Sequence, residues 1–425
     1  MPSVSDIVVV GAGAAGLMTA ISAGRALQRA AGLRHSTGRV VVLDAARTIG
    51  AKILVSGGGR CNVTHHDVDE RQYAGGSRHT IRRVIQQFDV RRTVEFFGEL
   101  GVKLKREETG KLFPVTDNAR TVLGALLGEA HRVGVEIVHP WKVAGVARRD
   151  GDFVLHRADA DERWHARRLV LATGGMALPK SGSDGSGYAL ARTLGHSMTP
   201  RVFPALVPLV VGAKSRWITG LAGISARVGV EVRSGTGKRI VRFEDDALCT
   251  HFGLSGPAIM NASRWLTEAR HADRSAGLWI AWVPGLNFEQ ADEELLALGA
   301  RTPGAWLRRR LPERLARAVC ESAGVDPSSP GHRLTREARR VLAHALVEMP
   351  VDIAHDRGFV HAEATAGGVA LSEVDPGSMQ SRVCERLWLV GELLDVDGQI
   401  GGFNFQWAWS SGFVAGRALA EDLPG

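Results

Sequence analysis

The fold is decided near the N-terminus by the stretch Ile7-Val8-Val9-Val10-Gly11-Ala12-Gly13-Ala14-Ala15-Gly16. The apolar, β-branched run Ile7–Val10 predicts a buried strand, and the Ala-rich segment Ala14–Ala31 predicts a helix. A second apolar run, Val40–Leu43, predicts another strand, which ends at Asp44. Strand, Gly-rich turn, helix and strand together form one βαβ unit of a parallel sheet.

The three glycines of this stretch form the pattern G-x-G-x-x-G, which between a strand and a helix is typical of dinucleotide binding. Gly11 allows the tight turn, Gly13 lets a pyrophosphate approach the backbone, and Gly16 lets helix and strand pack closely. The start of the helix offers N–H groups and partial positive charge to phosphates. Asp44 is expected to accept hydrogen bonds from the adenosine ribose, and its carboxylate favours NAD or FAD over NADP.

Two features around this unit need an explanation. Asp44 follows Gly16 at more than the usual distance of about 20 residues, and we expect the polar loop Leu33–Gly38 to absorb the excess. The uncharged stretch Ile7–Gly24 resembles a signal peptide or membrane span. However, no basic residue precedes it and glycines interrupt it, so we expect a cytoplasmic protein that does not contact a membrane.

The remaining glycines favour FAD over NAD. The chain has 51 glycines among 425 residues, about 12% against a usual ~7%. Clusters follow the predicted strands, in the loop Ser56–Asn62, after the strand Arg168–Ala172 and between Gly391 and Asn404. The last cluster leads into a predicted helix, Phe405–Ala420, whose first N–H groups could face the flavin pyrimidine and stabilise the anionic reduced flavin. An NAD-only dehydrogenase has no need of such a return to the nucleotide domain.

Three predicted strands, Val135–Val138, Lys142–Ala147 and Phe153–His156, resemble the β-meander crossover of FAD-binding domains. Val143, on the middle one, is expected to face the adenine. The segment between residues 45 and 62 is expected to be a long, polar, Gly-rich connection, in which glycine N–H groups and Arg60 can contact an anion.

Several motifs together resemble one bacterial family of FAD-dependent flavoproteins, often labelled aminoacetone-oxidase-like or NAD(P)/FAD-dependent oxidoreductases. They are Lys52, SGGGRCN at 56–62, Phe113-Pro114, ATGG at 172–175, SGSDGSGY at 181–188, THFGLSGP at 250–257, Gly367-Gly368-Val369 and the stretch from Gly391 through Gly412. The resemblance covers nearly the whole chain. This sequence departs from the family pattern at three positions, with Asp44 where Glu is usual, Ala14 where Pro is common and Phe403 where Tyr is frequent.

The resemblance implies an α/β fold with a glutathione-reductase-type Rossmann FAD-binding domain, an inserted β domain and a small helical domain. We expect the FAD-binding part to span residues 1–196 and 351–425, the inserted β domain 197–286 and the helical domain 287–350. The FAD-binding residues are expected to be Gly11, Gly13, Ala14, Ala15, Gly16, Asp44, Ala45, Lys52, Ser56, Gly58, Arg60, Cys61, Asn62, Val143, Thr173, Gly174, Gly391, Glu392, Asp395, Gly401, Gly402, Phe403 and Asn404.

Three residues are candidates for catalysis. Cys61 could donate a proton, or have a thiol pKa lowered by the neighbouring Arg60, although a packing role is the alternative. His251 could act as acid or base from the inserted domain, or serve as a structural hydrogen-bonding residue. Arg60 could bind an anionic group of the substrate, or else hold the loop or FAD. The cysteines are far apart and show no metal-ligand spacing, so we expect reduced thiols and no bound metal.

The resemblance leaves several functions open. We expect hydride transfer between flavin and a small substrate in a cleft between the FAD domain and the insertion, either oxidation of an amino ketone or amine, or reduction of a C=C bond. No second G-x-G-x-x-G follows a strand, so NAD(P)H would dock only transiently as electron donor. An alternative is reduction of uridine in ribosomal RNA, supported by the net charge of +8 and by ten arginines within residues 301–340. A third is a non-catalytic flavin-bound sensor.

Overall fold

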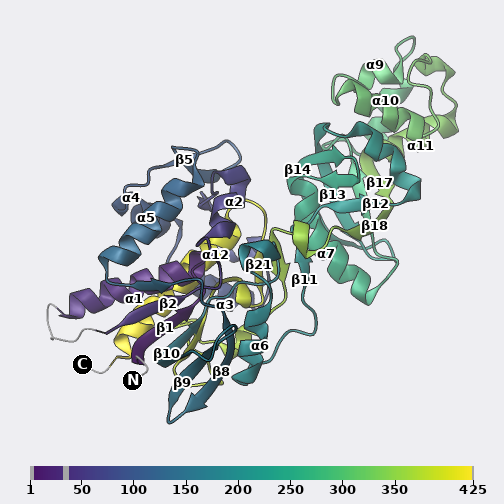
Figure 1. Cartoon of the computed structure of the whole chain (residues 1–425). Coiled ribbons are helices and arrows are strands. Elements are labelled where there is room, and N and C mark those ends of the chain that lie inside the picture. Colours follow the sequence, from purple (N-terminus) through teal and green to yellow (C-terminus); the bar gives the residue numbers. More distant parts are fainter. Residues whose placement is uncertain (1–3, 32–37, 424–425) are drawn as a thin grey trace. The chain divides into compact units, whose positions relative to one another are not determined.

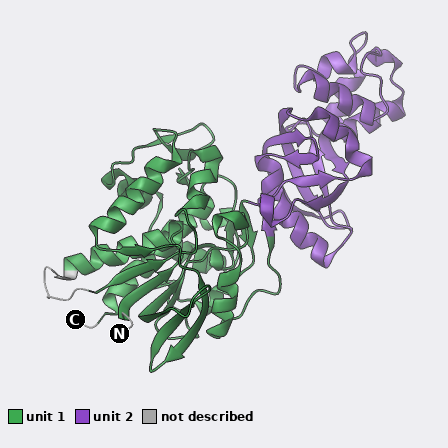
Figure 2. Cartoon of the chain, in the orientation of Figure 1, with its two compact units in different colours: residues 1–203, 363–425 green, residues 204–362 purple. Residues whose placement is uncertain are grey.

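The computed structural model describes residues 4–31 and 38–423, so the expected loop Leu33–Gly38 lies almost entirely outside the described residues. The chain divides into two compact units, residues 1–203 with 363–425 and residues 204–362 (Figure 2). The insertion expected from the sequence spans residues 197–350, whereas the second unit spans 204–362. Unlike the expected pair of domains, residues 204–362 form one unit.

Unit 1 is built on a sheet in which the strand order is β7-β2-β1-β10-β9-β8, with β20 also paired to β10 (Figure 1). Its strands are β1 (Val4–Val10), β2 (Val40–Leu43), β7 (Glu136–Val138), β8 (Val143–Arg149), β9 (Asp152–Arg157), β10 (Arg163–Leu171) and β20 (Leu387–Leu389). β1 pairs in parallel with both β2 and β10, and β10 pairs in parallel with β20. This confirms the expected α/β, Rossmann-type domain, because the C-terminal strand β20 returns to the sheet that the N-terminal βαβ unit begins.

The meander differs from the expectation. β7 pairs in parallel with β2 and so extends the Rossmann sheet, whereas the antiparallel strands are β8, β9 and β10. The periodicity of short apolar runs does not distinguish a parallel edge strand from a meander strand, because only the partner strand decides which it is.

The helices of unit 1 are α1 (Ala14–Ala31), α2 (Ala51–Gly59), α3 (Arg78–Ile85), α4 (Val90–Glu99), α5 (Ala119–Arg132), α6 (Ser186–Thr193) and α12 (Phe403–Glu421). Of these, α1 and α12 begin and end close to the expected Ala14–Ala31 and Phe405–Ala420. α2 was not expected, since the connection between residues 45 and 62 was interpreted as loop throughout. Its helical geometry stops at Ser56, where ψ is 148°, and Gly57 and Gly58 follow with φ of 55° and 69°.

α1 and α12 pack against each other across small residues (Figure 1). A Cβ added at Gly412 would lie 2.6 Å from the carbonyl oxygen of Ala15, and one at Gly416 would lie 2.4 Å from that of Thr19. Glycine at these two positions lets the helix backbones approach more closely than any side chain would allow. The C-terminal helix is thereby held against the helix that follows the Gly-rich turn.

Unit 2 contains an antiparallel sheet of order β17-β16-β13-β14-β15-β12-β18. Its strands are β12 (Leu209–Val211), β13 (Ser225–Arg233), β14 (Arg239–Thr250), β15 (Gly253–Ser255), β16 (Gly277–Ala281), β17 (Met349–Val351) and β18 (Ile353–Asp356), and its helices are α7 (Pro257–Ala272), α8 (Phe288–Leu296), α9 (Pro303–Leu307), α10 (Glu313–Ser322) and α11 (Arg336–Glu348). Strand residues such as Val230 share one buried core with Leu266 of α7 and Leu346 of α11. This shared core explains why the expected β and helical domains form a single unit.

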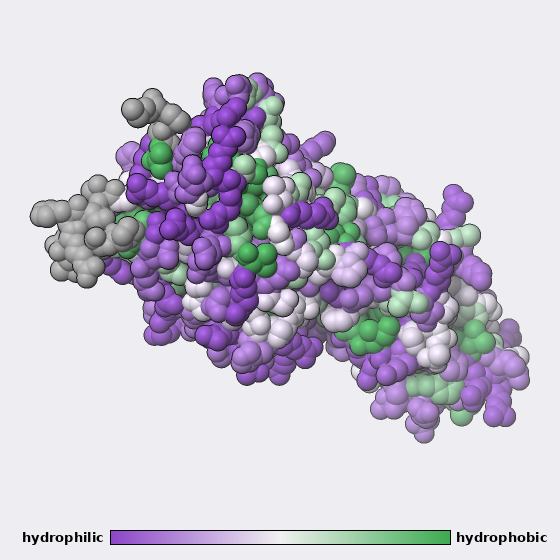
Figure 3. All heavy atoms as spheres, turned by 90° about the horizontal axis from the view of Figure 1, so that it is seen from below, coloured by the Kyte–Doolittle hydropathy of each residue, from purple (hydrophilic) through white to green (hydrophobic). Residues whose placement is uncertain are grey.

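The described residues also form smaller elements. They are β3 (Thr64–His65), β4 (Tyr73–Gly75), β5 (Leu104–Arg106), β6 (Lys111–Pro114), β11 (Phe203–Ala205), β19 (Ala364–Ala366), β21 (Val396–Gly398) and seven short 3-10 segments. Within the described residues, no helix has both the length and the apolar character needed to cross a membrane. Hydrophilic residues cover most of the face seen in Figure 3, and the hydrophobic ones lie in separate small groups.

Candidate functional site

The turn after β1 has the geometry that its glycines predicted. Gly11 has a φ of +108°, and a Cβ there would lie 2.5 Å from the carbonyl oxygen of Ala172. A Cβ on Gly16 would lie 1.8 Å from the carbonyl oxygen of Gly11. At Gly13, by contrast, an added Cβ meets nothing within 4 Å. Gly11 and Gly16 are therefore required by packing, while Gly13 faces open space at the N-terminus of α1, where a phosphate group fits.

Asp44 is held at the end of β2 beside this turn. One carboxylate oxygen accepts the N–H of Ala12 at 2.5 Å and the other accepts the N–H of Ala46 at 2.7 Å. The Asp44 carbonyl accepts the N–H of Trp141 at 2.7 Å, which brings the start of β8 at the buried Val143 to the same edge of the sheet. Because these bonds orient the carboxylate, an adenosine ribose placed here would meet a fixed acceptor.

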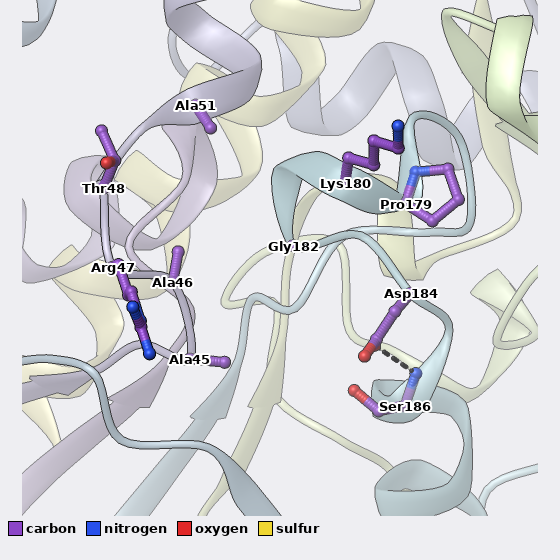
Figure 4. A pocket seen from close by; sticks show the side chains of 10 residues that line it. All are labelled: Ala45, Ala46, Arg47, Thr48, Ala51, Pro179, Lys180, Gly182, Asp184 and Ser186. Carbon is purple, nitrogen blue, oxygen red and sulfur yellow. Dashed lines mark hydrogen bonds between the residues drawn. The ribbon is translucent and has the colours of Figure 1, made fainter.

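Next to Asp44 lies a cavity of about 350 Å³ (Figure 4). One wall is the loop 45–51, which includes Arg47, and the other is the segment 179–186, which includes Lys180. Asp184 accepts the N–H of Ser186 at 3.0 Å and pairs with Lys142 at 2.9 Å. Of the lining residues only Ala45 was expected at the site, although 181–186 belong to the quoted motif SGSDGSGY. Their proximity to the loop 45–51 is a tertiary contact that spacing alone does not reveal.

Two segments 340 residues apart meet at Lys52 and Glu392. The ammonium of Lys52 pairs with one carboxylate oxygen of Glu392, and the other oxygen accepts the N–H of Thr365 at 2.8 Å. Gly391 lies directly on α1, since a Cβ there would lie 2.7 Å from the Cβ of Ala15. These contacts place the C-terminal glycine segment along the same edge as the first Gly-rich turn.

The loop after α2 carries a polar group that fits a ligand. Asn62 is buried, and among the described residues nothing hydrogen-bonds its side-chain oxygen. A Cβ on Gly57 would lie 3.1 Å from the backbone nitrogen of Asn62, so the turn Ser56–Gly58 folds back onto this residue. An unpaired buried oxygen together with the open space at Gly13 fits a large polar cofactor such as FAD.

The start of α12 completes the edge. Gly402, with a φ of +97°, caps the helix, and a Cβ there would lie 2.6 Å from the carbonyl carbon of Thr64. The carbonyl of Phe403 accepts the hydroxyl of Tyr73 at 2.9 Å. The Asn404 side chain bonds both the N–H and the carbonyl of Gly398, at 2.9 and 3.0 Å. The segment Gly401–Asn404 is therefore held in a fixed conformation next to Thr64, two residues after Asn62. The carbonyl of Asp395 accepts the N–H of Gly76 at 2.8 Å.

Thr173 and Gly174, at the end of β10, lie beneath α6. A Cβ on Gly187 would lie 1.8 Å from the Thr173 hydroxyl, and one on Gly174 would lie 2.7 Å from that of Ser183. All the residues expected to bind FAD thus belong to unit 1, where the contacts above link its Gly-rich segments. Their contacts with FAD itself stay a prediction.

The structure does not provide the reactive thiol that the sequence suggested at Cys61. Its side chain is fully buried, and burial raises the pKa of the thiol to about 12, with a hydrogen bond to Ser56 as a smaller opposing effect. The expected lowering of this pKa by Arg60 is wrong, because the Arg60 guanidinium bonds Glu107 at 2.6 Å and stacks over Phe113. The Arg60 side chain also donates to the carbonyl of Gly57 at 3.4 Å, and its role at the site stays a prediction.

His251 belongs to unit 2 and lies just beyond β14, exposed, with its ring against Phe252 at 5.1 Å between centroids. Its role toward a flavin stays a prediction. Over the part of the chain that the structure describes, no group of three or more His, Cys, Asp or Glu side chains could hold a metal ion, and all four cysteines are free thiols.

Comparison with known proteins adds a family to this geometry. The model of the family described as HI0933-like protein Rossmann domain matches residues 5–418. The chain is 34% identical over 418 residues, 97% of this chain and 98% of the relative, to a 3-dehydro-bile acid delta(4,6)-reductase of Clostridium scindens. It is 29% identical over 437 residues, 99% and 100% of the two chains, to a ribosomal RNA dihydrouridine synthase of Haemophilus influenzae.

Solved structures share the fold at low identity. A 3-ketosteroid delta1-dehydrogenase from Sterolibacterium denitrificans matches with a TM-score of 0.51 and 13% identity, covering 99% of this chain and 100% of that chain. The quinol fumarate reductase subunit FrdA of E. coli matches with a TM-score of 0.50 and 16% identity, covering 99% and 70%. At such identities the likeness concerns the fold alone.

Proposed function

This chain belongs to the HI0933-like family of Rossmann-domain proteins and is an FAD-dependent oxidoreductase, and we propose that it reduces a carbon–carbon double bond conjugated to a carbonyl group. The observation that carries the proposal is the full-length similarity, at 34% identity, to a delta(4,6)-reductase. The relative named dihydrouridine synthase points to the same chemistry, since dihydrouridine is uridine with a conjugated double bond reduced. Oxidation of an amino ketone has no such support.

The residues of unit 1 would hold FAD, which supplies hydride transfer when bound. The backbone at Gly13 and the start of α1 would bind the pyrophosphate, and Asp44 would accept the ribose hydroxyls. The first turn of α12 after Gly402 would direct N–H groups toward the flavin, where positive potential favours the anionic reduced form. The pair Lys52–Glu392 joins the two segments that would enclose the cofactor.

Reduction of the double bond requires two electrons and two protons from a donor and an acid. We propose NAD(P)H as the electron donor, docking transiently, because the sequence has no second G-x-G-x-x-G turn after a strand. Of the three catalytic candidates, Cys61 has a raised pKa and Arg60 is engaged in the loop. His251 is therefore the proposed proton donor, since histidine is the side chain that most often serves as a general acid.

Ribosomal RNA is the alternative substrate, and the charge distribution supports it less than the composition suggested. Four of the ten arginines within 301–340 are paired with carboxylates, namely Arg308 with Glu313, Arg310 with Glu294, Arg317 with Glu321 and Arg339 with Asp292. Such local pairing weakens the long-range field that an RNA backbone would meet. A small conjugated ketone therefore remains our proposed substrate class.

An anaerobic turnover experiment tests the proposal. The FAD-loaded protein is mixed with NADH or NADPH, and loss of the visible flavin absorbance reports reduction. A 3-oxo steroid with conjugated 4,6 double bonds is then added, with the saturated 3-oxo steroid as matched control. We expect the conjugated compound alone to restore the flavin absorbance and to gain two hydrogens per double bond reduced.

Two results would contradict the proposal. A protein that takes up no FAD would remove its basis. Reoxidation of the reduced flavin by a uridine-containing ribosomal RNA fragment, but not by the conjugated ketone, would assign the RNA substrate instead.

A further inference from the structure

Tyr188 lies at the junction of the segments that would enclose FAD, and no role was expected for it. It belongs to the first turn of α6, which begins after Gly185 with a φ of +79°. Its neighbour Gly187 lies against the Thr173 side chain at the end of β10. Ser186, two residues before Tyr188, lines the cavity beside Asp44 (Figure 4). The helix therefore starts directly against the nucleotide-binding edge.

The hydroxyl of Tyr188 is buried without a hydrogen bond. The residue is only 5% exposed, and among residues 4–31 and 38–423 nothing bonds its phenolic oxygen. Burial raises the pKa of this hydroxyl, and the nearby negative charges of Glu392 and Asp395 raise it further. The group is therefore a neutral donor in the neighbourhood of these two carboxylates.

An unmet donor of this kind costs the folded chain stability unless a ligand accepts its bond. Glu392 already pairs with Lys52 and accepts the N–H of Thr365. FAD carries several acceptors in its ribityl chain and phosphates, and the segments around Tyr188, at Thr173 and at Glu392, are those that line its proposed path. A neutral O–H suits these oxygens, because it adds no charge beside the two carboxylates.

We infer that the hydroxyl of Tyr188 donates a hydrogen bond to the sugar-phosphate part of bound FAD, and that this residue is a cofactor-binding residue of the chain. The inference rests on the proposed function, in that unit 1 must bind FAD. It adds a side-chain donor from the first turn of α6, where the motif SGSDGSGY at 181–188 ends. If the hydroxyl had a purely structural role, its removal would destabilise the FAD-free protein. If it binds FAD, its removal would weaken FAD binding without this destabilisation.

The test compares Tyr188→Phe with Tyr73→Phe, which changes the only other tyrosine of the chain. The Tyr73 hydroxyl already donates to the carbonyl of Phe403 at 2.9 Å. FAD-free protein is titrated with FAD, and quenching of flavin fluorescence gives the dissociation constant. Thermal melting of each FAD-free variant gives its stability without the cofactor.

For Tyr188→Phe we expect FAD to bind about 3- to 10-fold more weakly, as loss of one hydrogen bond implies. Its FAD-free form should melt at the wild-type temperature or above, because the variant removes a buried donor that had no partner. Tyr73→Phe should lower the melting temperature of the FAD-free protein, because it breaks an existing bond. In the absence of FAD, only the Tyr73→Phe variant should therefore have a lower melting temperature than the wild-type protein.

Failure of the inference and failure of the proposed function give different results. If the wild-type protein binds no FAD, both are overturned. If it binds FAD and Tyr188→Phe binds equally tightly, only the inference is overturned. Destabilisation of the FAD-free Tyr188→Phe protein to the extent seen for Tyr73→Phe would likewise overturn it, since the hydroxyl would then have a structural partner.

Discussion

Single glycines in the first turn have separate tasks. Gly16 is required by packing, because a Cβ there would lie 1.8 Å from the Gly11 carbonyl oxygen and 3.2 Å from the Cβ of Ala172. Gly13 has no such neighbour, and its φ is not in the left-handed region. Gly16 is therefore needed for the stability of the turn, whereas Gly13 is available to a ligand, although both belong to the same motif.

At this residue scale we predict opposite outcomes for Gly16→Ala and Gly13→Ala. Gly16→Ala should destabilise unit 1 by about 3 kcal/mol, because the new methyl group overlaps fixed backbone atoms, and the distorted turn should weaken FAD binding as well. Gly13→Ala should leave the melting temperature of the FAD-free protein unchanged and weaken FAD binding at least tenfold, since the methyl group occupies the approach of the pyrophosphate. Unchanged FAD affinity in Gly13→Ala would disprove the assigned role.

Among the elements, α1, α4 and α5 are joined by one cluster of charges. The Glu129 carboxylate of α5 is only 6% exposed and pairs with Arg25 of α1 and with Arg132. Arg25 also bonds Glu99 of α4 at 2.9 Å. The hydrogen bond from Arg132, opposed by partial burial and assisted by Arg25, holds the pKa of Glu129 below its ordinary value. The charged form of Glu129 therefore stabilises the contact between these helices.

At the element scale we predict that Glu129→Gln destabilises unit 1 by about 1–3 kcal/mol at pH 7. Because the pKa of Glu129 is depressed in the folded state, its contribution is complete above the unfolded-state pKa of about 4.3 and is lost as the pH falls through the folded-state pKa. In urea unfolding, the difference in the free energy of unfolding between the variant and the wild-type protein should decrease below about pH 4.3.

The control for this prediction is Glu95→Gln on α4. Glu95 is exposed and 3.7 Å from Arg91 in a surface pair, so its loss should change stability by well under 1 kcal/mol. If the loss of stability in Glu129→Gln were the same from pH 7 to pH 3, the charge of Glu129 would not contribute to stability.

For the whole molecule, the two units have separate hydrophobic cores. All the residues expected to bind FAD lie in unit 1, which consists of residues 1–203 and 363–425 (Figure 2). A ligand that binds only the folded form of one unit raises the stability of that unit. Cofactor binding and unfolding of the insertion are thus expected to be separable in the full chain.

At this scale we predict two transitions when the intact protein unfolds in a calorimeter. FAD at 100 times its dissociation constant should stabilise one unit by about 2.7 kcal/mol, which moves its midpoint up by several degrees. The other midpoint should stay in place. Gly16→Ala should lower the transition that FAD raises, which assigns it to unit 1. If the protein showed a single unfolding transition whose midpoint rises with FAD, the two units would unfold together and the prediction would be wrong.

Features that depend on neighbours along the chain can be predicted from the amino-acid order. The turn Gly11–Gly16, the limits of α1 and β2, and the position of Asp44 follow from local backbone geometry and apolar periodicity. The remaining features of the fold and of the site depend on contacts between segments that are distant in the sequence. The tertiary structure pairs β7 with β2, joins Lys52 to Glu392 and buries Cys61 so that its pKa rises. It also leaves the Tyr188 hydroxyl without a hydrogen-bond partner among the residues that the structure describes. The physical reason is that strand pairing, burial and desolvation depend on which distant residues come into contact, and residue spacing does not specify those contacts.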